Sequence, residues 1–213
     1  MNISRLSLNP QKRGARKLMG SPEAMHAAVR SGFAPGTDPG RVLWRVDSKE
    51  HGQATLYVVS AVEPDLEHVA EQAGWPTQAP AESRPYDPLL SRLKAGQRWA
   101  FRLTANPVHR GRLSDGTQKI MGHVTVDQQL SWLMDRQERI GLALETADQE
   151  PTAAVIARSV LTFRRQTSRV TVSSVTYEGV GVVTEPEALR TALTQGIGRA
   201  KAYGCGLMTL AVP

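Results

Sequence analysis

The spacing of hydrophobic residues in the first half of the chain predicts alternating strands and helices. Spaced leucines and an isoleucine predict a first strand over Asn2–Leu8. A helix is predicted from Ser21 to about Ser31, because a serine hydroxyl can cap its amino end and Pro22 suits the first helical position. The other elements predicted here are strands over residues 42–46 and 55–62 and a helix over residues 65–73.

The second half shows the same alternation more clearly. Trp99, Phe101 and Leu103 lie on one face of a strand predicted over Arg98–Ala105. A polar, basic loop is expected to follow over residues 108–122. The later elements are predicted as a helix over residues 125–140, strands over 155–165 and 169–177, a helix over 186–194 and a final strand over 207–212.

This order of elements predicts an α+β protein made of two tandem ferredoxin-like (RRM-like) βαββαβ domains. The N-terminal domain is predicted over residues 1–74, although its fourth strand is not visible in the sequence. The C-terminal domain is predicted over residues 97–213. Four prolines between residues 75 and 96 disfavour regular structure, so this segment is predicted to be a linker.

The charge of the chain favours a polyanionic partner. Lys and Arg number 26 against 20 for Asp and Glu, which gives a net charge of +6 and an isoelectric point near 9.8. Only 5% of the residues are aromatic, and Phe163 is the one aromatic residue of its predicted strand. Recognition of an RNA would therefore use phosphates and duplex shape more than base stacking.

The cysteine and hydropathy patterns bear on the compartment. The single Cys205 excludes an intramolecular disulfide and fits a reducing environment. No apolar run is long enough to span a bilayer, and the first ten residues lack the hydrophobic core of a signal peptide. We expect a cytoplasmic protein with no membrane partner.

Three segments concentrate positive charge and are candidate RNA contacts. They are the stretch after the first strand (Lys12, Arg13, Arg16, Lys17), the predicted hairpin (Arg158, Arg164, Arg165, Arg169) and a glycine-rich loop (Gly196, Gly198, Arg199, Lys201). Each segment also has a structural interpretation: a solvated loop, an edge hairpin kept soluble by charge, and a helix C-cap followed by a tight turn. The glycine-rich loop matches no nucleotide motif, since Ala202 follows Lys201 where a Walker A loop has Ser or Thr.

Metal and cofactor sites are not indicated. The chain has no His/Cys cluster at ligand spacing, so we expect neither a metal nor a cofactor. Asp135, Glu138 and Asp148 could be collected around magnesium, but acids at helical spacing more often form a solvated face. RNA cleavage without a metal uses the neighbouring 2′-hydroxyl as nucleophile and needs a proton carrier, for which histidine is suited. The five histidines are at positions 26, 51, 68, 109 and 123.

Four stretches together resemble one family. They are the opening strand with basic residues after it, SPEAMH at residues 21–26, FRLTANP at residues 101–107 and GIGRAKAYGCGLMTLA at residues 196–211. In order and spacing they are similar to the CasE family, the precursor-RNA endoribonucleases of type I-E CRISPR systems. The resemblance implies a metal-independent endoribonuclease that binds the repeat stem-loop of precursor CRISPR RNA. It further implies cleavage at the 3′ side of the stem, a 2′,3′-cyclic or 3′-phosphate and a 5′-hydroxyl as products, and continued binding among the other Cascade subunits.

The resemblance selects His26 as the catalytic histidine. Where the family often has a tyrosine three residues earlier, this chain has Glu23, and Ser31 stands where some members carry a lysine. Arg30 is the candidate for the missing positive charge, while an ionised Glu23 would repel the phosphate. These departures leave open an alternative, a non-catalytic subunit that binds structured RNA. A nucleotide-binding enzyme using the glycine-rich loop is a third possibility.

Overall fold

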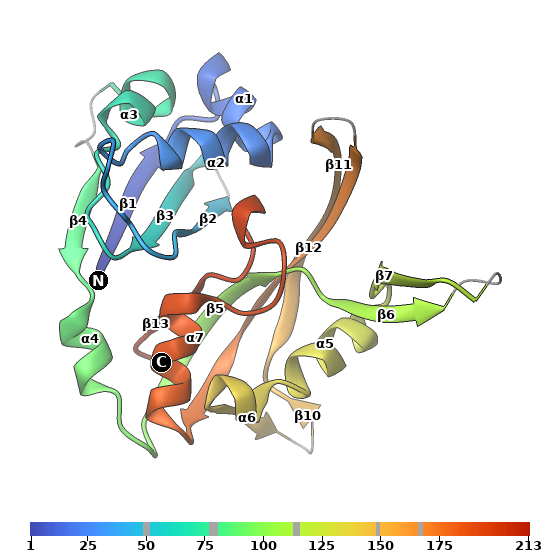
Figure 1. The fold of residues 1–213 in the computed structure, drawn as a ribbon. Helices are drawn as coiled ribbons and strands as arrows, with labels where there is room; N and C mark the ends of the chain where they lie inside the picture. The colour runs from blue at the N-terminus through green and yellow to red at the C-terminus, as the bar shows by residue number, and fades with distance from the viewer. Residues whose placement is uncertain (49–51, 77–80, 113–115, 148–149, 166–167) are drawn as a thin grey trace.

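The fold is built around two larger antiparallel sheets, each covered by helices (Figure 1). A computed structural model describes the chain except residues 49–51, 77–80, 113–115, 148–149 and 166–167. The N-terminal half lies at the upper left of Figure 1, and the C-terminal half lies below and to the right of it.

The N-terminal sheet has the strand order of a ferredoxin-like domain. Its order is β2-β3-β1-β4, formed by β1 (Asn2–Leu8), β2 (Leu43–Ser48), β3 (Ala54–Ser60) and β4 (Glu82–Pro85). The helices of this half are α1 (Arg13–Gly20), α2 (Pro22–Arg30) and α3 (Glu67–Ala73). Leu18, Met25 and Val69, one from each helix, are buried in a core with the leucines of β1 and β3. This burial holds the three helices against one face of the sheet.

The C-terminal sheet repeats this order. It reads β11-β12-β5-β13, with β8 (Leu142–Leu144) as a fifth strand beside β12. The four main strands are β5 (Arg98–Ala105), β11 (Ala154–Arg165), β12 (Ser168–Val183) and β13 (Met208–Ala211), and the helices are α5 (Val126–Met134), α6 (Gln137–Ile140) and α7 (Pro186–Gln195). In each half the second, third, first and fourth main strands lie side by side in that order. The predicted fold class is confirmed.

Two segments expected to be irregular contain regular structure. The basic stretch after β1 forms α1, because Ala15 and Leu18 are buried and Gly14 lets the helix approach the backbone of Gln72. The loop expected over residues 108–122 instead contains a hairpin of β6 (Val108–Arg112) and β7 (Gln118–Gly122). This hairpin projects from the body of the molecule (Figure 1), so its residues lack the one-sided apolar pattern that marks a strand packed on a core.

The predicted helix over residues 125–140 is interrupted, and small strands follow it. It divides into α5 and α6, with Asp135 and Arg136 between them. A short pair of strands, β9 (Thr146–Ala147) and β10 (Glu150–Pro151), comes after β8.

The segment predicted to be a linker, residues 75–96, also contains structure. The fourth strand of the first sheet, β4, lies here and pairs with β1, and α4 (Asp87–Arg92) follows it. Pro85 ends an edge strand and Pro88 lies in the first turn of α4, two positions where a missing N–H is tolerated. The boundaries proposed for the two domains stay a prediction.

The two halves share a hydrophobic core and a buried ion pair. Leu43 and Val59 of the first sheet belong to the same core cluster as Phe101 and Leu103 of the second. Arg45 of β2 is 2% exposed; its guanidinium donates to both carboxylate oxygens of Asp47, at 2.6 and 2.8 Å. It also donates to two backbone oxygens of the other half, those of Arg102 (2.8 Å) and Leu207 (3.0 Å). These contacts fix the two sheets relative to each other.

Candidate functional site

The helix with the candidate catalytic histidine meets the glycine-rich loop in space. After α7 the loop turns into a short 3-10 helix, η2 (Lys201–Tyr203), which packs against α2 and β2. Figure 1 shows η2 as a red coil close to β2 and below α2. Two segments singled out at opposite ends of the sequence therefore lie side by side.

Two glycines of this loop allow it to pack closely against β2 of the N-terminal half. A Cβ at Gly196 would lie 2.7 Å from Cδ2 of Leu43, and one at Gly204 would lie 2.8 Å from Cζ3 of Trp44. Both glycines have positive φ angles, 77° and 79°. A larger residue would be strained and would push the loop away from β2. This gives Gly196 a structural role, while Gly198 and Arg199 are more open to solvent.

Sequence and packing explain the position of α2. The Ser21 hydroxyl accepts a hydrogen bond from the backbone N–H of Ala24 at 3.2 Å, and Pro22 lies in the first turn. Met25 and Val29, four residues apart, are fully buried. His26 is therefore carried beside the buried stripe and is half-buried.

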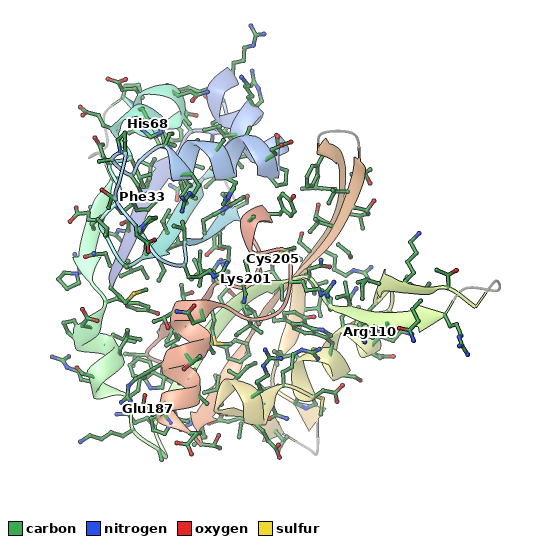
Figure 2. All side chains as sticks on the ribbon, in the orientation of Figure 1. Phe33, His68, Arg110, Glu187, Lys201 and Cys205 are labelled. Carbon is green, nitrogen blue, oxygen red and sulfur yellow. The ribbon has the colours of Figure 1, made fainter. Side chains whose placement is uncertain are left out.

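The charged neighbours of His26 on α2 are exposed. Arg30 lies one turn after the histidine on the same face of the helix, and Glu23 lies one turn before it. The hydroxyl of Ser31 contacts Nε2 of His68 at 3.0 Å and donates to the backbone oxygen of Ala28. His68, labelled in Figure 2, thus ties the end of α2 to α3. Ser31, which stands at the position of the family lysine, is therefore held by hydrogen bonds within the fold.

A cleft of about 370 Å³ opens between the two halves, beside α2. Leu18, Pro22 and Met25 line one wall, at the corner between α1 and α2. Arg158 of β11 lines the opposite wall, with Tyr203 of η2 nearby. The helix with His26 and the basic hairpin β11–β12 thus border one cleft, as the sequence could not show.

The hairpin rests on η2 through aromatic contact. The rings of Phe163 and Tyr203 meet edge to face, with centroids 4.9 Å apart. Arg158 is exposed, and its Nη1 donates to the backbone oxygen of Val124 at 3.2 Å. The backbones of the other three predicted arginines lie near the end of the hairpin, but their side chains fall outside the described part of the structure; these are Arg164, Arg165 and Arg169.

The cations of α1 divide into two kinds. Nζ of Lys12 donates to the backbone oxygen of Glu71, and Nη1 of Arg16 donates to that of Gln11, so both have local structural contacts. Arg13 and Lys17 are exposed, and their side chains have no hydrogen bond or ion pair among the described residues. These two are the better placed of the four to contact a ligand.

The sequence did not reveal two groupings of titratable side chains. The rings of His109 and His123 lie 4.6 Å apart at the base of the β6–β7 hairpin. Burial lowers the pKa of His123, and the nearby His109 and Arg136 lower it further. Arg136 and Arg139 line a cavity together with Lys201 of the glycine-rich loop. The only sign of this cationic cavity in the sequence is the density of arginines around α6.

The described residues hold no group of three or more His, Cys, Asp or Glu side chains that could bind a metal ion. Asp135 and Glu138 are exposed, and Asp148 lies outside the described residues. No helix within the described ranges is both long and apolar enough to cross a membrane.

With two joined ferredoxin-like halves and a cleft between them, the chain is a tandem ferredoxin-like protein. The model of the family described as CRISPR associated protein matches residues 1–212, and the chain belongs to this family. CRISPR-associated endoribonuclease Cse3 of Thermus thermophilus is 30% identical over 220 residues, which cover 99% of this chain and 100% of the relative. CRISPR system Cascade subunit CasE of Escherichia coli K12 is 32% identical over 127 residues, 56% of this chain and 60% of that protein. The resemblance to the CasE family is thereby confirmed.

Solved structures support the same relationship. CRISPR endoribonuclease Cse3 bound to a 19-nucleotide RNA superimposes with a TM-score of 0.82 and 29% identity, covering 100% of both chains. Thermus thermophilus Cse3 bound to an RNA that represents a pre-cleavage complex gives a TM-score of 0.81 and the same identity, over 99% of this chain and 98% of that one.

Proposed function

We propose that this protein is the endoribonuclease that processes precursor CRISPR RNA, and that it remains bound to its product as a Cascade subunit in the cytoplasm. It binds the repeat stem-loop and cuts at the 3′ side of the stem without a metal ion. The observation that carries the proposal is the cleft with the His26 helix on one wall and the basic hairpin on the other. The full-length similarity to proteins named as CRISPR endoribonucleases supports it.

The residues of α2 supply the chemistry. The 2′-hydroxyl attacks the neighbouring phosphorus while the bond from phosphorus to the 5′ oxygen breaks, which leaves a 2′,3′-cyclic phosphate and a 5′-hydroxyl. His26 transfers a proton in this step, and Arg30, on the same face of the helix, stabilises the negative charge of the phosphorane-like transition state. Glu23 is kept away from the phosphate by charge repulsion.

The RNA contacts are assigned to the cations around the cleft and to the glycine-rich loop. They are Lys12, Arg13, Arg16, Lys17, Arg158, Arg164, Arg165, Arg169, Gly196, Gly198, Arg199 and Lys201. Leu18 and Met19 at the C-terminal end of α1 line the cleft, as do Pro22 and Met25 of the His26 helix and Tyr203 of η2, so α1, α2 and η2 border the same cleft. Phosphate contacts of this kind give affinity and register, and they make binding dependent on salt.

A second function is favoured by one observation, the side chains at the two positions where the family carries tyrosine and lysine. Glu23 cannot donate a hydroxyl, and Ser31 is engaged with His68 and Ala28. A non-catalytic subunit that binds the same stem-loop would keep every RNA contact and lack only cleavage.

The deciding experiment separates binding from chemistry. Repeat RNA with a single 2′-deoxy residue just 5′ of the scissile phosphate should bind normally and remain uncut. His26→Ala should keep the affinity for unmodified RNA within a few fold and lower the cleavage rate by about 10² to 10⁴, the usual worth of one positioned acid or base. Glu23→Ala is the matched control on the same helix and should keep most of the rate.

The outcomes divide the hypotheses. Tight binding by the wild type without any cleavage would select the non-catalytic subunit. Cleavage of the deoxy RNA at the normal rate would mean that water is the nucleophile, and the assignment of His26 would lose its support.

A further inference from the structure

A second cavity, of about 150 Å³, lies between α6, the end of α7 and the glycine-rich loop. Arg136, Arg139 and Lys201 line it, together with the backbone of the loop at Gly196 and Gly198. Figure 2 labels Lys201 near the centre of the molecule, just below Cys205. Because pockets for whole organic ligands usually exceed roughly 300 Å³, this cavity suits a single small group.

The cavity gathers positive charge from separate elements. Burial lowers the pKa of Lys201, and the nearby guanidinium groups of Arg41 and Arg139 lower it further. Within the described part of the chain, Arg41, Arg139 and Lys201 form no ion pair or side-chain hydrogen bond. Like charges held together at a partly buried site repel each other, and a bound anion would relieve that repulsion.

The backbone just before Lys201 is strained in a way that fits a binding role. Ala200 has φ = 62°, and it is the only non-glycine residue with a positive φ among those described. A residue other than glycine, Asn or Asp rarely adopts this conformation. The turn at Ala200 starts η2 and brings Lys201 to the cavity.

The position of the cavity suggests which anion it takes. Arg136 lies close enough to His123 to lower its pKa, so one side of the cavity adjoins the base of the β6–β7 hairpin. On the other side, η2 packs against α2, the helix that carries His26. Arg136 thus adjoins the base of the β6–β7 hairpin, and the loop that carries Lys201 adjoins the His26 helix.

We propose that this cavity is a subsite for one backbone phosphate of the RNA, held by Arg136, Arg139 and Lys201. The inference rests on the proposed function, since it places an RNA strand between the β6–β7 hairpin and α2. Arg136 also packs over the Trp132 ring at 4.0 Å and donates to the Trp132 backbone oxygen, so its position is fixed before any ligand binds. Arg139 and Lys201 are the groups that close on the phosphate.

The test measures how RNA affinity depends on salt. The double variant Arg139→Gln with Lys201→Gln removes two charges and leaves the fixed Arg136 in place. The slope of log K against log salt should become shallower by roughly 0.7 to 0.9, the value for one lost phosphate contact and not for two. Lys94→Gln, an exposed lysine after α4 that lines neither cavity, is the control and should keep the wild-type slope. A double variant with the slope of the control would overturn the proposal.

A series of RNAs, each with one uncharged methylphosphonate linkage, locates the phosphate. The wild type should lose affinity at one linkage whose replacement no longer affects the double variant. Equal losses for both proteins at every linkage would refute the subsite. If inorganic phosphate protects the wild type against thermal unfolding without competing with RNA, the cavity binds a small anion instead. A wild type that does not cleave RNA refutes the proposed function, whereas an active wild type with unaffected variants refutes only this inference.

Discussion

The buried Arg45 offers the sharpest test of how the two halves are held together. Replacing Arg45 with Met keeps an unbranched side chain in the space and removes all hydrogen bonds of the guanidinium group. The change leaves the Asp47 carboxylate, 8% exposed, with Arg102 as its remaining cation at 3.3 Å. It also leaves two carbonyl oxygens and the Thr209 hydroxyl without the donor they now have.

The magnitude follows from these contacts. Removing one partner of a buried ion pair costs about 3 to 5 kcal/mol, and the remaining contact to Arg102 places this case near the lower end. For a domain of this size, roughly 3 kcal/mol lowers the melting temperature by roughly 6 to 12 °C. Urea unfolding gives the free energy directly. Arg98→Met is the control, because Arg98 pairs with Glu145 at the surface, where solvent screens the pair and it contributes little to stability.

The double variant Arg45→Met with Asp47→Asn identifies the cause. If the cost comes from an uncompensated buried charge, neutralising Asp47 should recover part of the lost stability. A double variant no more stable than Arg45→Met would show that the charge is not the cause. An Arg45→Met protein as stable as the wild type would refute the whole argument.

Two more predictions concern pH and the glycine-rich loop. The pKa of His123 is lowered in the folded state, so the unfolded state binds a proton more readily. The stability of the fold should therefore decrease as the pH drops through about 6.5, the ordinary pKa of histidine. In urea unfolding, the stability of His123→Gln should depend less on pH in that range, and an unchanged dependence would contradict the prediction. Gly204→Ala should destabilise the protein by more than Gly36→Ala, because both glycines have a positive φ but only at Gly204 would the new Cβ meet Trp44. The positive φ alone costs about 1 to 2 kcal/mol. Equal losses of stability in urea unfolding would show that the contact with Trp44 does not matter.

The parts of the fold that were predictable are those packed on a core. β5 has the predicted bounds, Arg98–Ala105, because Phe101 and Leu103 are buried on one face and Arg102 between them is not. The β6–β7 hairpin was missed since it projects into solvent and its positions lack that alternation. β4 was missed for a different reason: it is a four-residue edge strand between prolines.

The site was predictable in its parts but not in its assembly. The charge of Lys201 and the glycines around it can be read from the chain, as can the cap and the buried stripe of the His26 helix. The packing of η2 against α2 could not be predicted, because it brings together segments from opposite ends of the sequence. Arg136 and Arg139 look like a solvated helical face until the fold brings Lys201 to them.

The two walls of the cleft belong to different halves, so the proposed function gives Arg45 a second testable role. α2 is part of the first half, and the β11–β12 hairpin is part of the second. Arg45 bonds to backbone oxygens on β5 and beside β13, so under the proposed function it would help to set the distance between His26 and an RNA held by the hairpin. A misplacement of about 1 Å can cost about 10²-fold in rate. Arg45→Met should therefore cleave more slowly than Arg98→Met even at temperatures where both are fully folded, and equal rates there would mean that the ion pair stabilises the fold without positioning the site.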